Sequence, residues 1–109
     1  MAERRPPETA ELRRLRRKID ALDKRIVAML NDRAALAREA GVAKTAAGRR
    51  AIRDAERERE VLLRVSMANH GPLPQADLLA LYRRLFVATR ALETRDRERS
   101  AGNDGADHT

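Results

Sequence analysis

The chain has 109 residues, a formal net charge of +7, 38% charged residues and only 2% aromatic residues. This length predicts one domain with a modest core of its own. Because cysteine is absent, disulfides, thiolate metal sites and cysteine nucleophiles are excluded. No apolar run reaches the ~20 residues of a membrane span, and the first residues lack the apolar stretch of a signal peptide. We therefore expect a cytoplasmic protein with no membrane partner.

A basic chain raises the question of nucleic-acid binding. Here the Lys and Arg residues are dispersed through helical segments and mixed with Asp and Glu. Almost no aromatic side chains are present on which bases would stack. We therefore interpret the basic residues mainly as solvated helix surface, and we expect no nucleic-acid partner.

The first predicted helix carries one long apolar seam. Residues 1–8 contain two prolines and are predicted to be a flexible leader, whereas the helix is expected to start near Thr9, a suitable N-cap, and to continue to Lys44. A helix of ~35 residues is ~50 Å long, while a compact domain of this size has a radius of gyration of ~13 Å. A second copy of the chain is therefore expected to cover the seam. Its apolar members, three or four residues apart, are Leu12, Leu15, Ile19, Leu22, Ile26, Met29, Leu36, Ala40 and Ala43.

Two further helices are predicted, which makes the expected fold class all-α. Residues 45–53 (TAAGRRAIR) interrupt the pattern and are predicted to form a basic, exposed loop in which Gly48 stops the first helix. The second helix is expected to begin at about Asp54 and to end before Gly71. The third is expected to run from about Pro74 to the late 90s. The helical domain is thus predicted over residues 9–99, followed by a disordered polar tail over residues 100–109.

Each predicted helix has a polar residue on its apolar face. In the first helix, Arg33 interrupts the seam, and Arg16 and Lys44 lie one residue off it. Each such residue has a structural explanation by itself, such as a solvated charge on a buried stem or a favourable helix-dipole end. If the helices pack through these faces, however, two or three cations would meet two carboxylates in a pocket for a small, multiply anionic ligand. The other two stripes are Ala55, Glu58, Leu62 and Val65 in the second helix, and Leu78, Leu81, Tyr82, Leu85, Thr89 and Leu92, flanked by Phe86 and Glu93, in the third.

Three segments together resemble the all-helical (AroQ-type, type II) chorismate mutases. The segment LRRLRRKIDALDKRIVAMLNDRAALAREAGVAK resembles the long first helix of that family, RDAERERE is similar to its D-x-x-R-E element, and NHGPLP followed by LYRRLFVATRALE is similar to its turn and last helix. The resemblance covers roughly residues 10–95. It implies three helices per chain, an intertwined homodimer with two shared sites, and the rearrangement of chorismate to prephenate in phenylalanine and tyrosine biosynthesis. That unimolecular reaction needs no cofactor.

The resemblance also implies which cations would hold the substrate dianion. Arg16 corresponds to the arginine that enters the site of the partner chain and binds one carboxylate. Arg33 corresponds to the arginine that binds the other carboxylate, and Arg57 to a further arginine of this clamp. Lys44 corresponds to the lysine that reaches a carboxylate and the ether oxygen.

Four remaining positions of the family's site are polar in this chain. Asp54 and Glu58 match the positions that meet the ring hydroxyl, and Thr89 matches a small hydroxyl position. Glu93 stands where the family usually has a glutamine that donates a hydrogen bond to the ether oxygen. The expected catalytic residues are therefore Lys44, Glu93 and Arg33.

Glu93 departs from the family pattern in a way that matters for catalysis. Because an ionised carboxylate donates no hydrogen bond, we expect Glu93 to act in its protonated form. Alternatively, Glu93 marks a different substrate, as in a 4-amino-4-deoxychorismate mutase or an isochorismate-pyruvate lyase of the same family. A third possibility is a non-catalytic regulatory module that partners another shikimate-pathway enzyme.

Overall fold

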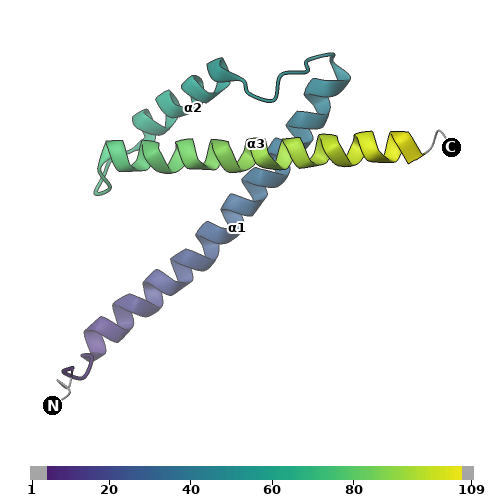
Figure 1. The fold of residues 1–109 in the computed structure, drawn as a ribbon. Coiled ribbons are helices and arrows are strands. Elements are labelled where there is room, and N and C mark those ends of the chain that lie inside the picture. Colours follow the sequence, from purple (N-terminus) through teal and green to yellow (C-terminus); the bar gives the residue numbers. More distant parts are fainter. Residues whose placement is uncertain (1–4, 107–109) are drawn as a thin grey trace. The chain divides into compact units, whose positions relative to one another are not determined.

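The computed structural model describes residues 5–106, which form three α-helices: α1 (Ala10–Ala46), α2 (Ala55–Ala68) and α3 (Gln75–Ala106) (Figure 1). No strand occurs among these residues, so the all-α prediction is confirmed. The outer ends of the predicted leader and tail, residues 1–4 and 107–109, lie outside the described residues. The chain separates into two units, residues 1–35 and 36–109, and each is considered by itself.

Helix α1 begins and ends where the residue types predict. The Thr9 hydroxyl oxygen accepts a hydrogen bond from the Leu12 backbone N–H at 3.0 Å, which is the geometry of an N-cap. With 37 residues, the helix is about 55 Å long. Beyond its end, Gly48 adopts a φ of 80°, in the left-handed region that other residues rarely enter. Gly48 therefore stops the helix, as expected.

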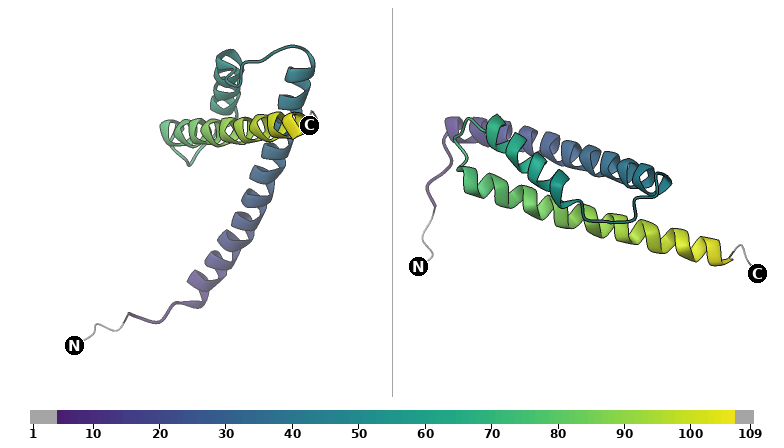
Figure 2. Two further views of the ribbon diagram at one scale, coloured as in Figure 1. Left: turned by 45° about the vertical axis from the view of Figure 1, so that its right-hand side comes forward. Right: turned by 90° about the horizontal axis from the view of Figure 1, so that it is seen from above.

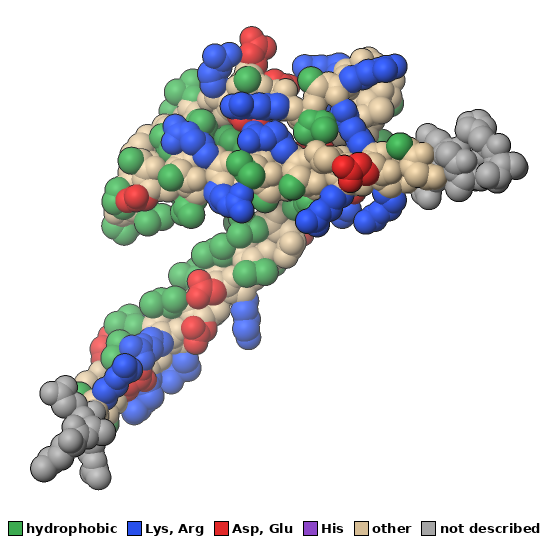
Figure 3. All heavy atoms as spheres, in the orientation of Figure 1, with side chains coloured by type: hydrophobic (Ala, Val, Ile, Leu, Met, Phe, Trp, Pro, Cys, Tyr) green, Lys and Arg blue, Asp and Glu red, His purple; other side chains and the backbone are tan. Residues whose placement is uncertain are grey.

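The apolar seam of α1 is uncovered in a single chain. Ile19, Leu22 and Ile26 are 55%, 51% and 50% exposed, and every other apolar member of the seam is exposed as well. Figure 3 shows hydrophobic side chains in a row along one edge of the N-terminal part of α1, with Lys and Arg gathered on the opposite edge. Such a continuous apolar stripe on a free helix marks an interaction surface.

Helix α2 is held between two local stop signals. The Asp54 side chain accepts a hydrogen bond from the Arg57 N–H at 3.0 Å, so Asp54 is the N-cap that the sequence predicts. After Ala68 the chain turns at Asn69, whose side-chain oxygen accepts a hydrogen bond from the Gly71 N–H at 3.0 Å. This short turn reverses the chain, so that α2 packs against α3, near its N-terminal end in Figure 2.

The buried face of α3 is rotated slightly from the predicted one. Phe86 is 7% exposed and meets the Tyr82 ring edge-on at a centroid distance of 6.4 Å, and Glu93 is also buried. Leu81, which the apolar stripe placed on the inner face, is 57% exposed. Hydrophobicity alone misplaced the centre of this face, because polar residues of α3 find charged partners on the neighbouring elements and turn inward with Phe86.

Helix α3 is also longer than predicted, because it continues to Ala106 rather than ending in the late 90s. The segment from Ser100 onward is polar but contains no proline. A helix satisfies its backbone hydrogen bonds locally, so a polar segment can prolong it without burying a side chain. None of the helices in residues 5–106 has the combination of length and apolar character that a membrane span requires.

Candidate functional site

Lys44 and Glu93 form the most buried ion pair among the described residues. Lys44 lies in the last turn of α1 and Glu93 lies midway along α3, and their Nζ and Oε2 atoms are 3.4 Å apart. The two side chains are only 20% and 10% exposed. The distance exceeds the 2.7–2.9 Å of a tight charge-assisted hydrogen bond. The pair is therefore a loose one, and a ligand oxygen can compete with Glu93 for the ammonium group of Lys44.

Gly41 gives the Glu93 side chain its place against α1. A Cβ atom at Gly41 would lie 3.4 Å from Glu93 Cγ and 3.5 Å from Glu93 Cδ, so the carboxyl group packs directly on the helix backbone. A larger side chain at this position would displace the carboxyl group. The close approach to the α1 backbone contributes to the burial of Glu93.

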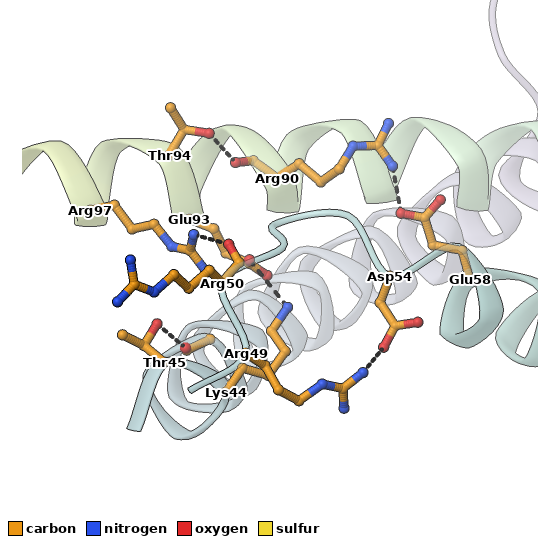
Figure 4. A network of polar contacts seen from close by, with 11 residues as sticks. Lys44, Thr45, Arg49, Arg50, Asp54, Glu58, Arg90, Glu93, Thr94 and Arg97 are labelled. Atoms are coloured by element: carbon orange, nitrogen blue, oxygen red, sulfur yellow. Dashed lines mark hydrogen bonds and ion pairs between the residues drawn. The ribbon is translucent and has the colours of Figure 1, made fainter. Parts of the chain in front are cut away.

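Glu58 is held by arginines from two different elements. Its Oε2 atom accepts a hydrogen bond of 2.5 Å from Arg90 Nη1 on α3, and its Oε1 atom lies 3.4 Å from Arg53 Nε in the loop before α2. Figure 4 shows Arg90 reaching from α3 towards Glu58, with Asp54 to the left of Glu58 and Lys44 further to the left. Glu58 is thus fixed in position by partners that follow it and precede it in the chain.

A small basic pocket adjoins Lys44. It measures about 250 Å³, and its walls carry four cations against one carboxylate. The loop before α2 supplies most of them, and Arg97 from α3 steadies that loop by donating a hydrogen bond to the Arg50 carbonyl oxygen. This charge balance attracts anions. The lining residues are Lys44, Arg49, Arg50, Ala51, Arg53 and Asp54.

Three of the expected site residues are engaged locally. Asp54 caps α2 and lies 3.4 Å from Arg49, so its carboxylate is partly used by its own loop. Arg57 is exposed and lies 3.5 Å from Glu60, one turn further along α2. The Thr89 hydroxyl donates a hydrogen bond to the Leu85 carbonyl oxygen at 2.9 Å. None of the hydrogen bonds and ion pairs just described involves Lys44 or Glu93.

The two remaining candidates, Arg16 and Arg33, belong to residues 1–35. Arg16 is 59% exposed and forms an ion pair with Glu8. Arg33 is half-buried, although it interrupts the apolar seam of α1. Lys44 and the carboxylates of the expected site therefore belong to the unit of residues 36–109, whereas Arg16 and Arg33 belong to the unit of residues 1–35.

Sequence reasoning missed Arg90, although one signal was available. Arg90 is the lone charged residue between Arg84 and Glu93, in a segment that otherwise reads as the apolar middle of a helix. A charge in such a segment requires a partner when the helix packs. The pattern could therefore have marked Arg90, but it could not name Glu58 as the partner, because 32 residues separate the two.

A second ion pair between α1 and α3 leads to a prediction about stability in acid. Arg38 donates hydrogen bonds of 3.0 and 2.8 Å to the two carboxylate oxygens of Asp96, and these bonds, aided by the charges of Arg38 and Arg99, lower the pKa of Asp96. The contribution to stability is therefore complete above about pH 4, where an unfolded aspartate is ionised, and is lost as the pH falls through the lowered pKa.

We expect Asp96→Asn to lower the thermal midpoint slightly at pH 7, and the difference from the unsubstituted protein to vanish in strong acid. Thermal unfolding followed by circular dichroism at several pH values measures this. Arg38→Gln should reproduce the effect, and the double variant should add nothing to either single one. A difference that persists unchanged at the lowest pH would contradict the role of this pair.

The geometry defines an all-helical protein with a buried pair of opposite charges between α1 and α3 and a basic pocket beside it. Residues 15–94 match the family described as chorismate mutase type II. Among solved structures, a chorismate mutase (form II) from Thermus thermophilus has a TM-score of 0.73 and 30% sequence identity, covering 78% of this chain and 96% of that one. The chain belongs to the type II chorismate mutase family.

Two curated relatives are longer than this chain. A bifunctional chorismate mutase/prephenate dehydratase of Aquifex aeolicus (strain VF5) is 38% identical over 87 residues, which are 76% of this chain and 24% of the relative. A protein of the same description from Stutzerimonas stutzeri is 34% identical over 102 residues, which are 90% of this chain and 28% of the relative. The chain thus spans about a quarter of the length of these relatives.

Proposed function

We propose that the chain is a chorismate mutase, an isomerase that converts chorismate to prephenate for aromatic amino-acid biosynthesis. The observation that carries the proposal is the buried Lys44–Glu93 pair beside a basic pocket, in a chain of this family. The reaction is an intramolecular rearrangement in which the ether C–O bond breaks as a new C–C bond forms. It requires no nucleophile, so the protein acts by holding the reactive conformer and stabilising charge.

In this proposal the substrate dianion is bound by a clamp of arginine side chains. Arg16, from a partner chain, and Arg33 each bind a carboxylate, and Arg57 extends the clamp. Arg57 is exposed and loosely paired with Glu60, so it is available to turn towards an anion. Bidentate guanidinium–carboxylate contacts fix orientation as well as position.

At the other end of the substrate, Asp54 and Glu58 accept a hydrogen bond from the ring hydroxyl, and Thr89 lines the site. Glu58 suits this role because Arg90 and Arg53 hold its carboxylate from two sides. The entropic cost of ordering this side chain when substrate binds is therefore small. The Thr89 hydroxyl bonds to its own helix, so Thr89 contributes shape more than hydrogen bonding.

Lys44 and Glu93 are assigned to the ether oxygen. Because their polar atoms are 3.4 Å apart, both can approach one substrate oxygen placed between them. In the free protein Glu93 is the partner of Lys44 in an ion pair. In the substrate complex Lys44 donates from its ammonium group, and Glu93 takes up a proton from solvent and donates from its carboxyl group. Both contacts strengthen as negative charge grows on the oxygen, so they favour the transition state over the ground state.

The protonated role of Glu93 predicts a particular pH dependence. A carboxyl group loses its proton as the pH rises and then repels the developing negative charge, whereas glutamine donates a hydrogen bond at every pH. We expect kcat of the unsubstituted protein to decline on the alkaline side and Glu93→Gln to remove that decline. The measurement is kcat against pH for both proteins.

Glu98→Gln is the matched control, because it makes the same substitution at an exposed position of α3. It should leave the pH profile of the unsubstituted protein unchanged. If Glu93→Gln shows the same alkaline decline as the unsubstituted protein, Glu93 does not act as the donor.

We further propose an intertwined homodimer in the cytoplasm. The seam along α1 is apolar up to Arg33 and exposed in a single chain, so a partner that covers it must present an apolar surface. A second copy supplies such a surface through the same seam, which is how a two-fold dimer pairs. The arrangement also explains how Arg16 would enter a site, since it would cross from the partner.

The identity of the reaction is tested by incubating the purified protein separately with chorismate, isochorismate and 4-amino-4-deoxychorismate and identifying the products. Prephenate formed from chorismate supports the proposal. Rearrangement of the amino compound alone, or release of pyruvate from isochorismate, would replace it with one of the two related enzymes.

A regulatory role is tested by the same assay. The curated relatives contain a chorismate mutase and a prephenate dehydratase in one chain, so a shikimate-pathway enzyme is a reasonable partner for this one. Turnover that is negligible with the isolated protein and rises strongly when such an enzyme is added would identify a partner-dependent module instead of a self-sufficient enzyme.

A further inference from the structure

The charge around Glu58 is unusual for a residue that would accept one hydrogen bond from a substrate. Arg90 Nη1 lies 2.5 Å from one carboxylate oxygen and Arg53 Nε lies 3.4 Å from the other. Glu58 and Arg90 are 17% and 28% exposed, so solvent only partly screens their interaction, whereas Arg53 is 67% exposed. Asp54, the other carboxylate assigned to this end of the substrate, is paired with Arg49 at 3.4 Å. Three arginines therefore accompany two carboxylates, and this corner of the site is net positive.

The sign of that charge distinguishes two substrates that have nearly the same shape. Chorismate has a neutral hydroxyl on its ring, whereas 4-amino-4-deoxychorismate has an amine at the same position, and such an amine takes up a proton near neutral pH. A carboxylate standing alone would attract the resulting ammonium group. The same carboxylate already neutralised by Arg90 and joined by Arg53 leaves a net repulsion, which low local dielectric strengthens.

We infer that Arg90, assisted by Arg53, is a specificity-determining residue that makes the Glu58 end of the site accept a hydroxyl and reject an ammonium group. The inference rests on the proposed function, in which Glu58 meets the ring substituent. Rejection by a like charge is a repulsive element of specificity, and the Glu58 oxygens retain lone pairs with which to accept a hydrogen bond from the hydroxyl. The position of Arg90 on α3, one turn from Glu93, keeps its charge inside the same site.

The test compares kcat/KM for the two substrates at one neutral pH. We expect Arg90→Gln to lower the preference for chorismate over the amino compound by about tenfold, which is modest for a charge removed at such short range. Arg90→Lys, which retains the charge, should keep most of the preference. Arg84→Gln removes an equal charge from an exposed position of α3 and should leave the ratio unchanged.

Arg53→Gln provides a second, independent variant, because its exposed side chain contributes little to folding. It should shift the ratio in the same direction as Arg90→Gln but by a smaller factor. If Arg90→Gln and Arg53→Gln reduce kcat/KM for both substrates by the same factor, the arginines only support the structure and the inference is overturned. Absence of chorismate turnover by the unsubstituted protein would instead overturn the proposed function.

Discussion

Replacing Lys44 by alanine is expected to lower kcat by about 100- to 1,000-fold, because it removes a preorganised donor from the ether oxygen at which charge develops. KM should change less, since the carboxylates retain their guanidinium partners. The measurement is steady-state turnover of chorismate. Lys24→Ala, at an exposed position of the same helix, is the control and should retain full activity.

Because Lys44 pairs with a buried carboxylate, we expect Lys44→Ala to lower the stability of the protein as well. Its loss would leave Glu93 without a cation, and an unpaired buried charge is costly. The double variant Lys44→Ala/Glu93→Gln removes both charges and should regain most of the lost stability while remaining nearly inactive. A Lys44→Ala protein that is folded and turns over chorismate within about threefold of the unsubstituted rate, far short of the loss expected for a missing donor, would refute the role of Lys44.

Mixing two inactive variants is expected to restore activity. If each site combines Lys44 of one chain with Arg16 of its partner, then Arg16→Ala and Lys44→Ala chains are both inactive alone. In a mixed dimer, however, one site receives both intact residues. Random exchange makes about half of the dimers mixed, each with one intact site of two, so activity should reach about a quarter of the unsubstituted value.

The experiment requires unfolding and refolding the two chains together, so that subunits exchange. Ile19→Glu chains serve as a control, because a carboxylate in the middle of the seam should prevent pairing and give a monomer by light scattering after size exclusion. Recovery in the mixture of Arg16→Ala and Lys44→Ala chains supports shared sites. No recovery from a mixture shown to contain mixed dimers would mean that Arg16 and Lys44 act within one chain or not together.

The local features of this chain were predictable from the residue types. Thr9 and Asp54 cap α1 and α2 because a short polar side chain can accept the hydrogen bond of a free backbone N–H. Gly48 ends α1 because it alone tolerates the left-handed turn that follows. The apolar seam was equally readable, because its period of three and four residues is the period of the helix itself.

The site was predictable only in part. The charges that interrupt the apolar stripes drew attention to Lys44 and Glu93, whose side chains the structure brings together, and to Glu58, which is half-buried between two arginines. The same reasoning did not show that Thr89 would bond to its own helix or that Arg90 would hold Glu58. An apolar stripe indicates which face of a helix is buried, but it does not indicate which residues of other elements pack against that face.

The helices, their start and stop signals, the apolar seam and the family can be predicted from residue types alone, because all of these depend on neighbours close in the chain or on motifs in fixed order. The partners of the buried charges depend on the fold: Lys44 pairs with Glu93 across 49 residues, and Glu58 pairs with Arg90 across 32. The buried face of α3 also differs from the predicted one, because Glu93 is buried and Leu81 is exposed. The physical reason is that a buried charge is stable only beside an opposite one, and the fold alone determines which distant residue that is.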